Sequence, residues 1–140
     1  MITLQVRGAD AVERTLRDIA PKHALALTRA TVGALTTEIT KDAKKNMNFT
    51  GRYSTGMMKK HTKKRVRKVR GGIVQNDVVV GRRAFYWRYY EYGQGGNPRK
   101  RMFEKALMDM NGKLAIRWEE LFMKKLVQRL ARERKRQGLR

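Results

Sequence analysis

The chain has 140 residues and carries 34 Lys and Arg side chains against 12 Asp and Glu, which gives a formal charge of +22 at pH 7. Its hydrophobic fraction of 41% is typical of folded soluble proteins, which argues against a wholly disordered polycation. The absence of Cys excludes disulfides and thiol nucleophiles, and two isolated His residues cannot form the usual His-rich transition-metal sites. We therefore expect neither a metal nor a cofactor.

No apolar stretch approaches the roughly 20 residues that a membrane span needs. The first 20 residues also contain charged side chains throughout, at Arg7, Asp10, Glu13, Arg14, Arg17 and Asp18. We expect a protein that is neither secreted nor inserted into a membrane.

The positive charge is concentrated in the middle of the chain. Residues 1–50 have a net charge of +3, residues 51–101 of +13 and residues 102–140 of +6. Like charges at this density oppose compaction unless anions lie nearby, so a polyanion or an acidic protein partner is expected.

The N-terminal third predicts one strand and two helices. Apolar and polar residues alternate over residues 2–7, the period of a half-buried strand. Asp10 then stands where a helix N-cap would, which predicts a short helix over residues 10–20. Pro21 suits an early position of a second, long helix that runs from Lys22 to about Asn46, rich in Ala and Thr.

The middle of the chain predicts a loop and a hairpin. Residues 47–58 contain two Gly and several hydroxyl and amide side chains, the composition of a loop. Between Lys59 and Arg70, eight of twelve residues are Lys or Arg. Gly71-Gly72 and the aliphatic pieces within residues 73–81 follow, so we expect a hairpin with a cationic first arm.

The C-terminal third predicts a long helix. Six aromatic residues lie within residues 85–93, and the chain then breaks at residues 94–98. From there an apolar stripe recurs at helical spacing, and Gly112 bends or splits the helix. The stripe consists of Phe103, Leu107, Met110, Leu114, Trp118, Leu121, Phe122, Val127 and Leu130.

The predicted architecture is one α+β domain over residues 1–128, followed by a basic C-terminal tail at residues 129–140 that frays unless a partner holds it. Its order is an N-terminal strand, a short and a long helix, antiparallel strands with a projecting basic hairpin arm, and a long C-terminal helix. No linker divides the chain into two domains.

The basic run is the first candidate site. Strand alternation would place cations on both faces of the arm, so neither face can pack against a core, and the arm should project toward a polyanion or an acidic partner. The residues expected to make this contact are Lys59, Lys60, Lys63, Lys64, Arg65, Arg67, Lys68 and Arg70.

The aromatic segment at residues 85–93 is the second candidate site. Its rings could stack on single-stranded bases. Tyr and Trp clustered in a strand more often form core and subunit contacts, because a large ring buries area while its polar tip finds a partner. We favour core and subunit contact.

A catalytic function finds little support in the acidic residues. Most of them lie on predicted helices, where exposed charge pairing explains them. Only Glu91, among four tyrosines, suggests a cleavage site of a small basic nuclease or toxin. We expect no catalytic residue and no enzyme.

The order of several short motifs resembles the tail-completion (neck) proteins of long-tailed phages, the broad family of tail components that includes the minor tail protein Z type. The resemblance covers roughly residues 2–125. Its motifs are Thr50-Gly51-Arg52-Tyr53, Val78-Val79-Val80-Gly81, Tyr90-Glu91-Tyr92-Gly93, and Asn97-Pro98-Arg99 before Met102-Phe103-Glu104-Lys105-Ala106-Leu107. The family positions, which the resemblance assigns to fold and subunit interface, are Gly51, Gly81, Tyr90, Glu91, Tyr92, Gly93 and Pro98.

The resemblance implies a structural virion protein that assembles in the host bacterial cytoplasm as a homo-oligomeric ring, commonly of six subunits, at the head–tail junction. Such a ring would join the head-completion (connector) protein to the tail terminator or tail tube, with genomic DNA passing through its lumen. Six copies would carry a charge of about +132, which requires anionic neighbours. The main alternative is a basic nucleic-acid-binding module that acts in RNA or DNA packaging or on the ribosome.

Overall fold

The computed structural model describes residues 21–48, 56–136 and 138. The strand expected at residues 2–7, the helix expected at residues 10–20 and the family position Gly51 lie outside the described residues. Within the described part, helices combine with a two-stranded antiparallel sheet, so the predicted α+β class is confirmed.

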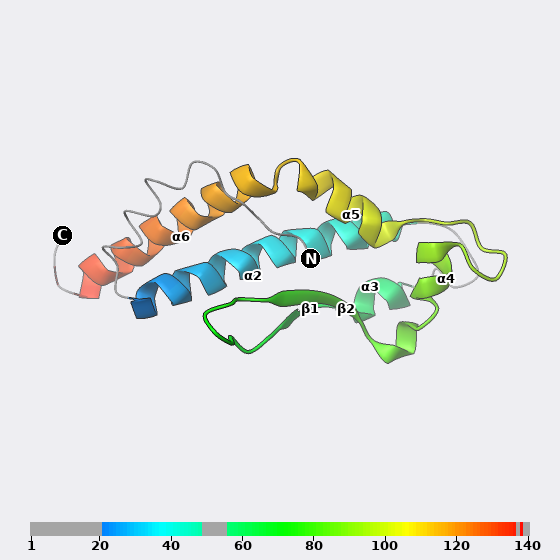
Figure 1. Ribbon diagram of the computed structural model, residues 1–140, viewed down its shortest axis with the longest axis horizontal. Helices are drawn as coiled ribbons and strands as arrows, with labels where there is room; N and C mark the ends of the chain where they lie inside the picture. Colours follow the sequence, from blue (N-terminus) through cyan, green and yellow to red (C-terminus); the bar gives the residue numbers. More distant parts are fainter. Residues whose placement is uncertain (1–20, 49–55, 137, 139–140) are drawn as a thin grey trace.

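The long helix α2, Pro21–Asn46, lies between the other elements. Helices α5 and α6 run along one side of it and the strands β1 and β2 along the other (Figure 1). Five Thr side chains of α2 donate their hydroxyl hydrogens to the carbonyl four residues earlier, at distances of 2.6 to 3.0 Å. Because these hydroxyls are satisfied within the helix, they can be covered without an unpaired polar group. The predicted helix from 22 to 46 is confirmed.

The hairpin forms where it was predicted, from β1, Thr62–Val66, and β2, Asn76–Val80. Its register pairs Thr62 with Val80 and Val66 with Asn76. Gly71 and Gly72 both have positive φ, +56° and +77°, and Ile73 donates its amide to the carbonyl of Arg70 across them at 3.0 Å. Two consecutive left-handed residues match the right-handed twist of paired strands, which is why two glycines stand there.

Two segments have a different conformation from the one predicted. Helix α3, Met57–His61, occupies the end of the expected loop, and it takes Lys59 and Lys60 out of the strand arm. The 3-10 helix η1, Arg82–Ala84, precedes the aromatic segment, and the helix α4, Trp87–Tyr92, lies within it, where clustered Tyr and Trp had suggested a strand. In segments this short, aromatic residues fit either period, and the tertiary contacts decide between them.

The C-terminal helix is split, one of the two outcomes expected at Gly112. Helix α5 spans Met102–Asn111 and helix α6 spans Leu114–Arg136. Most of the expected tail at residues 129–140 therefore belongs to α6, and Arg129 Nη2 lies 2.6 Å from His23 Nδ1 of α2.

Among the described residues, two clusters of buried side chains lie near the two ends of α2. One joins Met47, Met58, Ala84, Tyr90 and Met102, and the other joins Leu27, Phe122 and Leu126. The predicted C-terminal stripe is only partly right: Leu121 and Phe122 are buried, whereas Leu107, Val127 and Leu130 are exposed.

A charge pair fastens α6 to the middle of α2. Arg117 donates from Nε and Nη2 to the two carboxylate oxygens of Glu38, at 2.9 and 2.6 Å, and from Nη1 to Glu120 at 2.7 Å. The hydrogen bond from Arg117 holds the pKa of Glu38 below its ordinary value, and the two carboxylates raise the pKa of Arg117. Two parallel bonds to one carboxylate also fix the azimuth of α6 on α2.

We predict that Glu38→Gln lowers the melting temperature at pH 7 and that this difference disappears in acid. A carboxyl group whose pKa is depressed by folding stabilises the protein above its unfolded pKa, and the contribution is lost as the pH falls through the folded value. Thermal unfolding of both proteins between pH 7 and pH 2.5 measures the effect. Glu119→Gln, on the exposed side of α6, is the control and should leave the profile unchanged. A difference that is constant with pH would contradict the prediction.

Candidate functional site

The fold brings six of the eight predicted cationic contact residues onto the hairpin and separates two from it. Lys59 and Lys60 lie on α3. The other six lie on β1 or in the connection to the Gly71-Gly72 turn, and all are exposed: Lys63, Lys64, Arg65, Arg67, Lys68 and Arg70.

The hairpin was predicted to project from the domain. It instead lies against α2, and Lys64 reaches across to that helix. Its Nζ donates to the carbonyl oxygen of Gly33 and to Oγ1 of Thr37, both at 3.0 Å. A Cβ at Gly33 would lie 3.6 Å from Lys64 Nζ, an ordinary contact distance, so this interaction does not require a glycine. The assumption that a cationic strand face cannot pack was wrong here, since a long stem lets the charge bond to backbone and hydroxyl oxygens.

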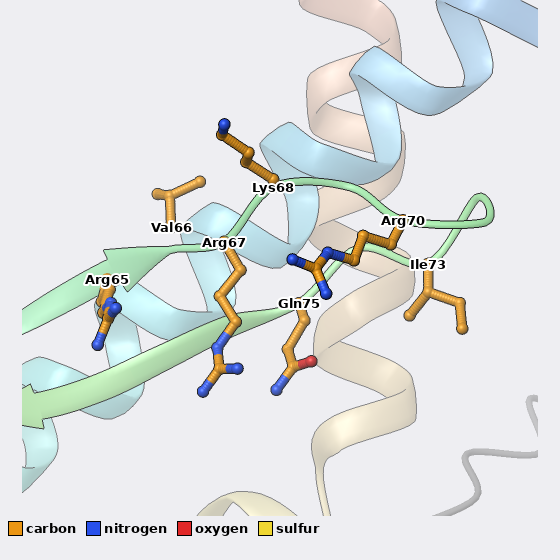
Figure 2. Close-up of a pocket in the computed structure, with 7 residues that line it drawn as sticks. All are labelled: Arg65, Val66, Arg67, Lys68, Arg70, Ile73 and Gln75. Atoms are coloured by element: carbon orange, nitrogen blue, oxygen red, sulfur yellow. The ribbon is translucent and has the colours of Figure 1, made fainter.

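A first hollow, which we call the hairpin hollow, opens between the two arms near the turn and has a volume of about 500 Å³. In Figure 2 the side chains of Arg65, Arg67 and Gln75 extend to one side of the hairpin and that of Lys68 to the other. Arg67 Nε donates to Asp77 Oδ2 at 2.5 Å, so one carboxylate holds this guanidinium in place. The hollow is lined by Arg65, Val66, Arg67, Lys68, Arg70, Ile73 and Gln75.

A second hollow, the α2 hollow, adjoins the first and measures about 490 Å³. It lies between the hairpin, α2 and α6, and it shares Val66 and Arg67 with the hairpin hollow. Arg29 from α2 and Lys125 from α6 join Lys64 in its wall. Sequence reasoning missed Arg29 and Lys125, because nothing in the sequence shows which exposed helix positions face the hairpin.

The aromatic-Glu-aromatic-Gly motif forms a corner that connects α4 to α5. Tyr90 is 5% exposed and packs in the first core cluster. Glu91 is 6% exposed, and its carboxylate accepts the amides of Phe103 and Glu104 at 3.1 and 3.0 Å. The first amides of a helix have no partner within it, so Glu91 caps α5 from another element. This role accounts for the acid that had suggested a cleavage site.

Gly93 and Gly81 each stand at a position where a side chain would be strained or crowded, for different reasons. Gly93 ends α4 in the left-handed conformation, with φ of +70°, and a Cβ there would lie 2.9 Å from Arg99 Cβ. Gly81 donates its amide to the carbonyl of His61 at 3.0 Å, and a Cβ there would lie 3.2 Å from the imidazole. Pro98 lies in the exposed irregular segment that leads to α5, and Tyr92 is 57% exposed.

A groove of about 860 Å³ lies beside this corner, between α2, β2, α4 and α5, and its mainly apolar wall also includes Arg88, Arg99 and Glu104. Its wall includes the exposed side chains of Tyr92, Leu107 and Met108, together with Trp87 and Phe103, whose rings meet edge to face at a centroid distance of 5.3 Å. The aromatic segment is thus partly core and partly accessible surface.

Metal and membrane features were searched in the described part of the chain. No group of three or more His, Asp or Glu side chains there could hold a metal ion. None of the described helices is both long enough and apolar enough to cross a membrane. Comparison with protein-family models, with curated proteins and with solved structures gave no match.

We predict that Glu91→Ala lowers the free energy of unfolding by about 2 kcal/mol, because two partly buried amides of α5 lose their acceptor. Glu91→Gln keeps one amide oxygen as an acceptor and should cost about half as much. Urea denaturation measures both. A Glu91→Ala variant as stable as the wild type would show that water caps α5 equally well.

Gly93→Ala and Gly96→Ala form a matched pair that separates steric contact from backbone strain. Both residues have positive φ, +70° and +76°, but nothing lies within 4 Å of a Cβ at Gly96. We expect Gly96→Ala to cost about 1 kcal/mol of stability through strain alone and Gly93→Ala at least about twice that. Equal losses in urea denaturation would contradict the contact with Arg99.

Proposed function

We propose that the protein is a structural subunit of a phage neck, a tail-completion protein that forms a ring between the head-completion protein and the tail terminator or tail tube. The order of motifs supports this family, and the corner at Tyr90 to Gly93 gives those residues a physical role. In this proposal the protein is not an enzyme, it assembles in the bacterial cytoplasm, and it remains in the virion at the head–tail junction.

The observation that carries the proposal is the amount of apolar surface left open. Among the described residues, twelve large hydrophobic side chains are exposed. The buried hydrophobic residues in the same part of the chain number twelve, and three of these are alanines, so only nine large side chains are buried there. Single exposed apolar residues are ordinary, but a contiguous apolar groove marks an interaction site. A thin fold of this kind gains stability when a second copy covers it, as it would in a closed ring.

The second candidate function, a basic nucleic-acid-binding module, is favoured by a specific observation. The two hollows gather cations from the hairpin, α2 and α6. A monomer that binds nucleic acid would use them, and it would leave the apolar groove without a function.

We expect purified protein to form rings of about six subunits as its concentration rises, measured by native mass spectrometry and by electron microscopy of stained particles. Leu107→Glu, which places a charge in the groove, should keep the helical circular dichroism spectrum and abolish the rings. Ala115→Glu, at an exposed position of α6 outside the groove, is the control and should assemble.

A chain that stays monomeric at every concentration and binds generic DNA below micromolar concentration at physiological salt would overturn the ring proposal in favour of the binding module. Rings that form equally well from Leu107→Glu would show that a surface other than the groove makes the contact.

A further inference from the structure

The hairpin hollow and the α2 hollow adjoin each other around the hairpin, and both are lined by cations. Their shared residues Val66 and Arg67 join them. Among the described residues that line them, no side chain is acidic and none is aromatic. The cations of the two linings are Arg29, Lys64, Arg65, Arg67, Lys68, Arg70 and Lys125.

Two of these cations are already held in position by protein oxygens. Lys64 donates two of its three N–H groups to Gly33 and Thr37 of α2, and its third N–H can donate to a ligand oxygen. Arg67 is bonded to Asp77 through Nε, and its terminal nitrogens, Nη1 and Nη2, extend from the hairpin (Figure 2). A donor fixed before binding loses little conformational entropy when the ligand arrives.

The chemistry of the lining favours phosphate groups of a nucleic acid over a protein surface. Protein interfaces are enriched in aromatic residues and depleted of Lys, whereas the described linings carry Lys64, Lys68 and Lys125 and no aromatic ring. Two adjoining cationic hollows suit a ligand that presents successive anions, as a phosphodiester backbone does. The lack of aromatic rings among the described lining residues also removes the stacking platforms on which single-stranded bases are held.

We infer that the joined hollows bind the phosphodiester backbone of duplex DNA without reading its sequence. Arg29 and Lys125 extend the contact from the hairpin onto the two long helices. This inference deepens the proposed function, in which DNA passes the protein, but it concerns a surface of the single chain and does not require the ring.

The experiment measures anisotropy of a fluorescent 20-base-pair duplex at several salt concentrations. Each phosphate contact contributes about 0.9 to the slope of the logarithm of affinity against the logarithm of salt concentration, so Arg29→Ala/Lys125→Ala should reduce the slope by about 2. Lys105→Ala/Lys113→Ala removes the same charge at exposed positions outside both hollows and should change the slope by less than about 0.5. Circular dichroism checks that both variants are folded.

Three results would overturn the inference: equal slopes for the two double variants, tighter binding of single-stranded than of duplex DNA, or equal competition by polyglutamate at matched charge. The last would identify an acidic protein as the partner. Ring assembly is measured on the same variants. Rings without duplex binding would reject only this inference, whereas duplex binding by a permanent monomer would reject only the ring.

Discussion

The helix α2 has to be covered on two sides, and the rest of the described structure depends on how it meets that constraint. A helix between two layers cannot carry long polar side chains at its buried positions. Thr31 and Thr40 are buried there, and each bonds its hydroxyl to its own helix. Leu27 of α2 packs with Phe122 and Leu126 of α6 on one side. On the other side, Lys64 of the hairpin bonds to the carbonyl of Gly33. The hairpin and α6 are thereby placed close enough to share the α2 hollow.

The second constraint is the corner at the end of α4. Glu91 is buried, and a buried carboxylate is tolerated only when its oxygens are hydrogen bonded. The amides at the start of α5 donate to both oxygens, so the buried carboxylate and the two helix amides satisfy each other. The corner fixes the direction of α5, and with it the position of Leu107 and Met108 in the apolar groove. The groove and the α2 hollow share Asn76 in their walls, so the two surfaces adjoin each other beside α2.

Much of the secondary structure was predictable because its signals are local. The helical spacing of apolar residues between Pro21 and Asn46 predicts a helix, and Gly71-Gly72 between a cationic and an aliphatic run predicts a tight turn. The clustered Tyr and Trp of the aromatic segment suggested a strand, but the segment forms the helix α4, because its local signal is weak. Six residues of α4 hold too little local preference, and packing of Tyr90 in the core and the cap that Glu91 provides decide for a helix.

The sequence by itself determined that the chain is a strongly basic α+β protein with its charge excess around residues 59–70 and a candidate motif at Tyr90 to Gly93. Composition and periodicity carry those properties, and they do not depend on distant contacts. Only the tertiary structure decided that Arg29 and Lys125 join Lys64 in one hollow, that Lys59 and Lys60 stay apart from it, and that Leu107 and Leu130 are exposed. The physical reason is that the azimuth of each helix is set by packing and by pairs such as Glu38 with Arg117, between residues 79 positions apart in the chain.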